Sequence, residues 1–253
     1  MSLMSKKDIP RDFLQVVYDD KTSEEGEDQK GETKWSRSEV DDVELEKSIG
    51  TLAAYAFITK TTTEDSYDLH RLVSLSMRNW LQKENVATMY ATQVVLRLNK
   101  IIPAPAFGNR SIWIRYLPHT RHIFSSAVKP KGVAAQGQLL RNVATAFLLL
   151  GNYEESKKYI EQALEMSTMA FGDKHPATLT TMNNLADVLG RQGKHGEAEK
   201  MYRQTLELME KVLGKEHPHT ITTMKNLAGL LDNQGKYEDA EKMHPSTDAT
   251  VEG

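Results

Sequence analysis

Cysteine is absent from the 253-residue chain, which excludes disulfide bonds, thiolate metal sites and cysteine nucleophiles. The chain also lacks a large excess of either charge. Its formal net charge of −3 is too small to indicate nucleic acid or a membrane as partner. The longest apolar run, residues 143–150, is far shorter than the ~20 residues that span a bilayer. Residues 1–15 contain no signal peptide. These absences predict a soluble, cytoplasmic protein of one or two domains.

Motifs for catalysis and metal binding are missing as well. No G-x-x-x-x-G-K-[ST] string is present to hold phosphates, and neither H-E-x-x-H nor G-x-S-x-G occurs. His119 and His122 are spaced as two metal ligands on a helix could be, but their neighbours are basic and no carboxylate is near in sequence. We interpret both as part of the polar face of a helix. The sequence therefore predicts a protein that is not an enzyme and has neither a cofactor nor a metal.

A repeat with a period of 42 residues is the strongest positive signal. Three equivalent stretches begin with NVATAFLLLGNY at Asn142, NLADVLGRQGKH at Asn184 and NLAGLLDNQGKY at Asn226. A glycine recurs at the same point of every copy: Gly151, Gly193 and Gly235. Such a glycine ends a helix well, because the residue after the last turn often adopts a left-handed conformation.

Each copy is expected to fold as a helical hairpin. In the second copy, Leu185 and Leu189 recur at helical spacing on a first helix, and Ala198 and Tyr202 do so on a second. The segment GKEHPHT at 214–220 separates this copy from the next, because proline stops one helix and starts another well. One hairpin cannot bury its apolar face alone, so successive hairpins must stack. The predicted fold class is mostly α, an α-solenoid of about three 42-residue hairpins.

The repeats resemble the tetratricopeptide repeat (TPR). Residues at the small and aromatic positions of that motif match: Ala186, Leu189, Gly193, His195, Ala198 and Tyr202. The period and the phrase HPxTxTTMxNLAxxL are similar to kinesin light chain-type repeats over residues 133–243. The resemblance implies a non-enzymatic solenoid whose concave groove binds peptides, with asparagines taking part.

Residues 40–83 follow another pattern. A helix, a short strand, a turn at TKTTTEDS, a returning strand at YDLH and a helix at RLVSLSMRNWLQ are predicted in that order. This winged-helix-like α/β fragment resembles the segment that follows the nucleotide-binding domain in fungal NLR-like (STAND) ATPases. The resemblance implies that His70 would contact a nucleotide only if a nucleotide domain were present. Without one, His70 is interpreted as a histidine at a strand end.

Four further segments complete the predicted domain organisation. Residues 1–18 resemble the helical segment that precedes such a winged helix, and residues 19–39 form an acidic, disordered loop. Residues 84–132 are interpreted as two helices that cap the solenoid, and 244–253 as a disordered tail.

The third copy breaks off after Met243. This predicts less cover for Leu227 and Leu231 than their counterparts have, and an uncapped repeat through which the chain can self-associate.

The candidate site is the solvent-facing side of the first helix of each hairpin. Six residues are expected there to bind a peptide: Arg141, Asn142, Asn183, Asn184, Lys225 and Asn226. Side-chain amides donate and accept hydrogen bonds, which suits an extended peptide backbone. Arg141 and Lys225 favour an acidic peptide or protein partner. The alternative that these asparagines bond to neighbouring repeats stays open.

The first functional hypothesis is a non-enzymatic adaptor or scaffold. One alternative is a truncated remnant of a STAND-type NTPase with an accessory role in a larger complex or pathway. Another is weak nucleic-acid binding through the winged-helix part, although the helix at 71–82 offers only Arg71 and Arg78 for it.

Overall fold

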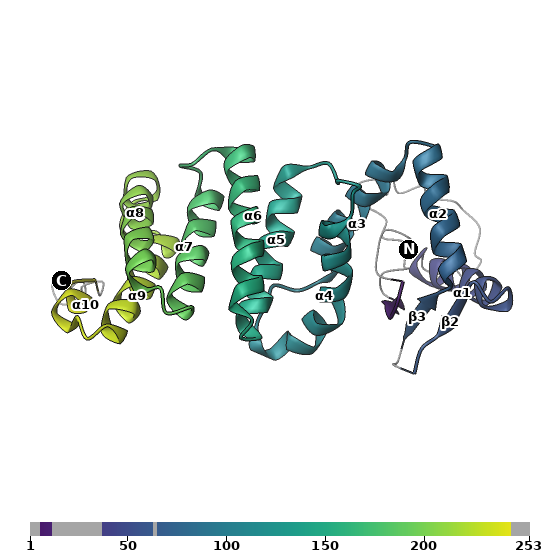
Figure 1. The fold of residues 1–253 in the computed structure, drawn as a ribbon, viewed down its shortest axis with the longest axis horizontal. Helices are drawn as coiled ribbons and strands as arrows, with labels where there is room; N and C mark the ends of the chain where they lie inside the picture. Colours follow the sequence, from purple (N-terminus) through teal and green to yellow (C-terminus); the bar gives the residue numbers. More distant parts are fainter. Residues whose placement is uncertain (1–5, 12–36, 63–64, 244–253) are drawn as a thin grey trace, which may run out of the picture. The chain divides into compact units, whose positions relative to one another are not determined.

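The computed structural model describes residues 6–11, 37–62 and 65–243, and helices dominate these residues (Figure 1). The predicted mostly α fold class is confirmed. None of the helices in these ranges is long and apolar enough to cross a lipid bilayer. The chain divides into two compact units. The first unit runs to Ile101 and includes Arg115–Lys129, and the second comprises Ile102–Ile114 and the residues from Pro130 onward.

The first unit contains a small antiparallel sheet with strand order β1-β3-β2. The three strands and the two helices next to them in the chain are β1 (Ile9–Pro10), α1 (Arg37–Ala54), β2 (Ile58–Lys60), β3 (Ser66–Leu69) and α2 (Arg71–Lys83). The predicted order of helix, strand, turn, strand and helix is therefore confirmed. Buried apolar side chains from the sheet and α1 form its core: Ile9, Ile49, Ile58, Tyr67 and Leu69.

Within the predicted helical segment 1–18 the structure describes residues 6–11, and these include the strand β1 and not a longer helix. Ile9 of β1 pairs with Tyr67 of β3. The backbone N–H of Leu69 donates to the Lys6 carbonyl at 2.8 Å, and that of Asp8 donates to the Asp68 carboxylate at 2.8 Å. Pro10 has no N–H and fits an edge strand, where no further ladder bond is needed. A strand of two residues has no periodicity that a sequence pattern could reveal.

Other parts of the predicted organisation fall partly or wholly outside the described residues. These are residues 1–5 and 12–18 of the predicted helical segment, most of the acidic loop and the tail at 244–253. Helix α1 begins at Arg37, so the last three residues of the predicted loop 19–39 are helical. The two helices expected in 84–132 are present as α3 (Ala87–Ile101) and α4 (Arg110–Ser125). Helix α3 and residues 115–129 belong to the same unit as the sheet.

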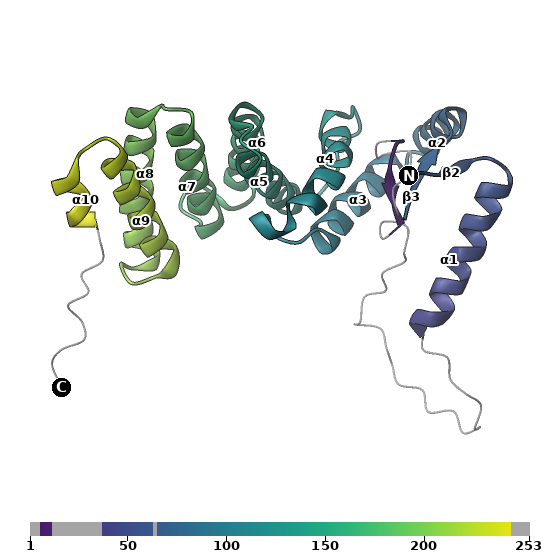
Figure 2. The ribbon, with the colours of Figure 1, turned by 90° about the horizontal axis from the view of Figure 1, so that it is seen from below.

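The second unit contains the repeats as consecutive helical hairpins (Figures 1 and 2). The helices are α5 (Val133–Leu149), α6 (Tyr153–Phe171), α7 (Pro176–Arg191), α8 (His195–Leu213), α9 (Pro218–Asn233) and α10 (Tyr237–Met243). Each packs against the next along the chain, and α7 also contacts α5 and α9. The predicted stacking of three hairpins is therefore confirmed. Buried side chains on both helices of a pair form the core, among them Val143, Ile160, Ala186, Ala198 and Leu227.

Local chemistry sets the ends of these helices as the repeat predicted. Gly151, Gly193 and Gly235 adopt φ angles of 76°, 79° and 75°, in the left-handed region. His175 and His217 cap the N-termini of α7 and α9: their Nδ1 atoms accept hydrogen bonds from the N–H groups of residues 177 and 219, at 3.1 and 3.2 Å. A proline follows each of these histidines as the first helical residue, where its missing N–H costs nothing.

Replacing Gly193 with alanine is expected to lower the free energy of unfolding by about 1 kcal/mol, because a side chain is strained at a positive φ. Gly196 is a matched control, since it lies within helix α8 and has open space where a Cβ would stand. Its change to alanine is expected to raise that free energy by up to about 1 kcal/mol. Urea unfolding of both variants measures the difference. Equal losses would contradict a conformational role specific to Gly193.

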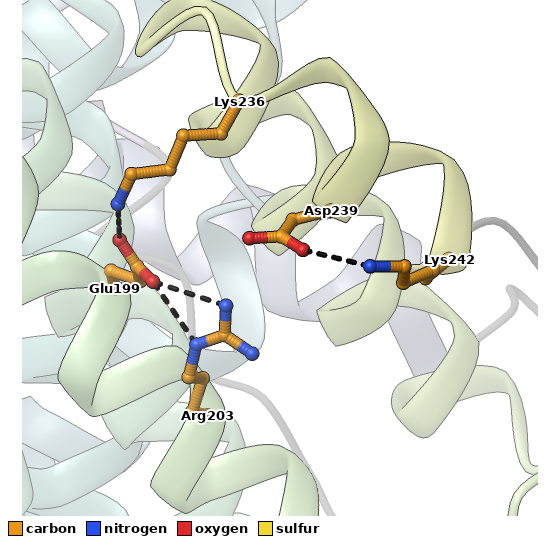
Figure 3. Close-up of polar contacts among 5 residues, drawn as sticks. All are labelled: Glu199, Arg203, Lys236, Asp239 and Lys242. Atoms are coloured by element: carbon orange, nitrogen blue, oxygen red, sulfur yellow. Dashed lines mark hydrogen bonds and ion pairs between the residues drawn. The ribbon is translucent and has the colours of Figure 1, made fainter.

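The last hairpin is better packed than the sequence predicted. Leu227 and Leu231 are fully buried, although less cover was expected for them. The short helix α10 packs on α9 and buries Ala240 there. The Lys236 ammonium donates to the Glu199 carboxylate of α8 at 2.7 Å, and Arg203 contacts the same carboxylate (Figure 3). This pairing holds the pKa of Glu199 below its usual value.

Candidate functional site

The six predicted site residues lie at equivalent positions of the three first helices. Arg141, Asn183 and Lys225 occupy one position of the 42-residue period, on α5, α7 and α9. Asn142, Asn184 and Asn226 occupy the next position. Because α7 contacts both α5 and α9, the structure brings these residues into one row across neighbouring helices.

The prediction that Asn183 is exposed on this row is wrong, because its side chain is buried. The Asn226 side-chain amide donates to Asn183 Oδ1 at 3.3 Å, and the Asn183 amide donates to Asn184 Oδ1 at 3.4 Å. Asn183 thus connects two repeats, which is the structural role left open for these asparagines. The half-buried Asn142 makes no side-chain hydrogen bond within the described residues, so its amide is available to a ligand.

Arg141 is a half-buried cation on α5. Its guanidinium forms neither an ion pair nor a hydrogen bond among the residues that the structure describes. The sequence contains no Asp or Glu between Asn85 and Tyr153, so no acidic residue is near it on α5. Burial lowers the pKa of Arg141, since removing a cation from water without a counter-ion is unfavourable. An anion bound at this position would relieve that cost.

A pocket of about 310 Å³ opens between α7, α8 and α9. Lys225 and Asn226 line it together with Asp187, Arg191 and Tyr202. Asp187 and Arg191 form an ion pair at 3.4 Å, so their charges largely cancel.

Lys225 is an exposed cation of this pocket and, unlike Arg191, it makes no ion pair in the described part of the chain. Burial, and then the charge of Asp187, raises the pKa of Tyr202, so its hydroxyl stays protonated. The pocket therefore offers an uncompensated cation beside a hydroxyl and an amide.

Tyr202, Arg191 and His195 line the pocket but were not predicted as site residues. Tyr202 matched an aromatic position of the repeat and was assigned to the core, where its ring is indeed buried. The spacing of Asp187 and Arg191, four residues apart on one helix, was visible in the sequence. It indicates a surface ion pair as readily as a site.

The histidines outside the repeats have structural partners. Nδ1 of His70 accepts from the backbone N–H of Leu72 at 3.3 Å and thereby caps α2. His119 is fully buried, not part of an exposed polar face, and its Nε2 lies 2.9 Å from the Asp8 carbonyl oxygen. His122 Nε2 lies 2.7 Å from Arg78 Nη2. Over the described ranges, no group of three or more histidines, cysteines or carboxylates is arranged to hold a metal ion.

Comparison with known proteins agrees with the repeat pattern. A family model for the tetratricopeptide repeat matches residues 136–211 and 188–244. A nucleotide-binding leucine-rich repeat (NLR)-like protein of Hyaloscypha variabilis is 39% identical over 138 residues, which are 54% of this chain and 14% of the relative. The chain thus spans a small part of the relative's length. The predicted likenesses to tetratricopeptide repeats and to NLR-like proteins are both confirmed.

Several solved structures are also similar to the chain. Two crystal structures come from a Podosopora anserina protein with nearly identical TPR-like repeats, assigned as a kinesin light chain. They are 17% identical, cover 66% of this chain and 88% of that one, and have TM-scores of 0.46 and 0.41. BtubC (BKLC) from P. vanneervenii is 16% identical over 67% of this chain and 65% of its own, with a TM-score of 0.44.

Proposed function

Because a family model for the tetratricopeptide repeat matches residues 136–244, we propose that the second unit is a non-enzymatic interaction module that binds an acidic peptide across α5, α7 and α9. The peptide belongs to a partner protein, and the chain acts as an adaptor or scaffold. Arg141, Asn142, Asn184, Lys225 and Asn226 are the residues proposed to contact it. Asn183 has a different role, because it positions Asn226 and Asn184 through its two hydrogen bonds.

The observation that carries this proposal is the unpaired, half-buried guanidinium of Arg141. A charged group that is partly removed from water costs free energy unless a counter-ion accompanies it. A carboxylate of the peptide would supply that counter-ion and could accept two parallel hydrogen bonds from the guanidinium. The unpaired ammonium of Lys225, at the equivalent position two repeats further on, would bind a second carboxylate.

The distance between these cations sets the spacing of the acidic residues. Packed helices lie about 8–10 Å apart, so α5 and α9, which flank α7, place the two cations roughly 20 Å apart. An extended chain rises about 3.3 Å per residue, so roughly six residues separate the two carboxylates. The amides of Asn142 and Asn226 lie beside the two cations, where they can bond to the intervening peptide backbone.

We test this with peptides selected on the intact chain from a random library. Aspartate and glutamate are expected to be enriched, and changing Arg141 or Lys225 to glutamine is expected to weaken each selected peptide by roughly tenfold. Fluorescence anisotropy of the labelled peptides measures this loss. Lys200 is exposed on α8, so its change to glutamine is the matched control and should leave binding unchanged. Selection without acidic enrichment, or equal binding by all three variants, would contradict the proposal.

The alternative of nucleic-acid binding through the first unit has less support. Helix α2 offers Arg71 and Arg78 for it, and the Arg78 guanidinium contacts His122 at 2.7 Å. An accessory role in a larger complex is compatible with peptide binding and stays a prediction.

A further inference from the structure

Helix α2 of the first unit exposes large apolar side chains on the side opposite its buried face. Ser74 and Leu81 are buried against the rest of the unit. Leu72, Leu75 and Trp80 are 65%, 45% and 53% exposed. Single exposed apolar residues are ordinary in proteins. Here three large ones lie within about two and a half turns of one helix, which is typical of a surface that a partner covers.

An aromatic pair extends this surface beyond the start of the helix. The rings of Tyr55 and Phe57 stack with their centroids 5.8 Å apart, and both side chains are exposed. The backbone N–H of His70, which caps α2, donates to the Phe57 carbonyl at 2.9 Å. This bond fixes the aromatic pair beside the first turn of α2. We call Tyr55, Phe57, Leu72, Leu75 and Trp80 the α2 surface.

Two exposed cations stand at the ends of α2. Arg71 is its first residue and Lys83 its last, and neither forms an ion pair with another described residue. Helix α2 contains no Asp or Glu. At a rise of 1.5 Å per residue the two cations are roughly 18 Å apart along the helix axis. A matching partner therefore carries negative charge at both ends of an apolar stripe of this length.

We propose that the α2 surface docks an amphipathic helix of a partner protein, whose apolar stripe is bracketed by carboxylates about three turns apart. The apolar side chains of the partner pack on Leu72, Leu75 and Trp80, and its carboxylates pair with Arg71 and Lys83. Recognition of an amphipathic helix through apolar anchors at helical spacing is a general mode of peptide binding.

Polar residues that lie among the members of the α2 surface favour a protein partner over a lipid surface. Ser76 and Asn79 are exposed between the apolar side chains. A partner helix can bond to their hydroxyl and amide groups, whereas hydrocarbon leaves such groups unsatisfied. Membrane-binding helices also carry several basic residues along the apolar stripe, while α2 has exposed cations only at its two ends.

The test uses the intact chain and two synthetic helical peptides of roughly 15 residues. Both have the same leucine stripe, but one has glutamates at its two ends and the other has lysines there. The glutamate peptide is expected to bind about tenfold more tightly, as measured by anisotropy of labelled peptide. The double variant Arg71→Glu, Lys83→Glu is expected to reverse this preference, because both charges change sign. Both residues are exposed, and circular dichroism checks that the variant is folded.

Further variants separate this site from the groove. Trp80→Ser is expected to abolish binding of the glutamate peptide, and circular dichroism checks that the variant is folded. Met169→Ser removes a large apolar side chain that is 67% exposed on the other unit and should change nothing, as should Lys225→Glu in the groove. Equal binding of the two peptides would overturn the proposal. So would binding to vesicles of phosphatidylcholine and phosphatidylserine without binding to either peptide.

Discussion

Replacing Leu227 with alanine is expected to lower the free energy of unfolding of the repeats by about 2–5 kcal/mol. Leu227 lies on α9 and none of its side chain is exposed. Alanine at this position loses the burial of the leucine side chain and leaves a cavity that the surrounding helices fill only in part. Urea unfolding followed by far-UV circular dichroism measures the change.

A control for this prediction is the conservative change of Val212 to alanine on α8, where the side chain is 44% exposed. We expect a change of less than about 0.5 kcal/mol there. A similarly small loss at Leu227 would contradict the packing of the last hairpin. It would instead agree with the weaker cover that the sequence predicted for this residue.

The burial of Leu227 was underestimated because the short helix α10 packs on α9 more fully than its length suggests. Helix α10 has only seven residues, so the sequence predicted a shortened second helix that would cover α9 poorly. Its position depends on contacts with other elements. The Lys236 side chain, for example, donates to the Glu199 carboxylate of α8, which lies 37 residues earlier in the chain. A period-based interpretation cannot predict such contacts, because they join residues far apart in the chain.

The repeats could be predicted from sequence because their signals are local. The glycine after each first helix and the HP turn before each new one act within a few residues of their own position. The 42-residue period repeats these signals. Strand β1 and the burial of His119 could not be predicted, because they depend on contacts between distant parts of the chain. Asp8 bonds to Asp68, 60 residues later, and His119 contacts Asp8, 111 residues earlier.

The sequence predicted where the candidate site lies better than it predicted what each of its residues does. Helical spacing placed Arg141, Asn183 and Lys225 on the same side of the first helices. It could not show that Asn183 turns inward to bond Asn226 of the next repeat. Burial of a polar side chain depends on whether a partner is within reach, and here the partner is 43 residues away.

Reversing both groove cations in the double variant Arg141→Glu, Lys225→Glu is expected to weaken a selected acidic peptide by at least about 100-fold. Two attractive ion pairs become two repulsive ones, and each charged hydrogen bond contributes about 1.5–3 kcal/mol. The same variant is expected to bind a peptide in which the two acidic residues are replaced by lysines.

The spacing of the acidic residues provides a second readout from the same measurement. In the unmodified chain, peptides with two glutamates roughly six residues apart should bind more tightly than peptides with adjacent glutamates, because only the former reach both Arg141 and Lys225. Anisotropy titrations with the double variant, the unmodified chain and a Lys200→Glu control separate these effects. If Lys200→Glu costs as much as the double reversal, the affinity comes from overall charge. A different result is expected: only the double reversal weakens the acidic peptide, and the same variant binds the lysine peptide. Arg141 and Lys225 are then the two points at which the groove recognises charge, since a general electrostatic field would not depend on the spacing of the acidic residues.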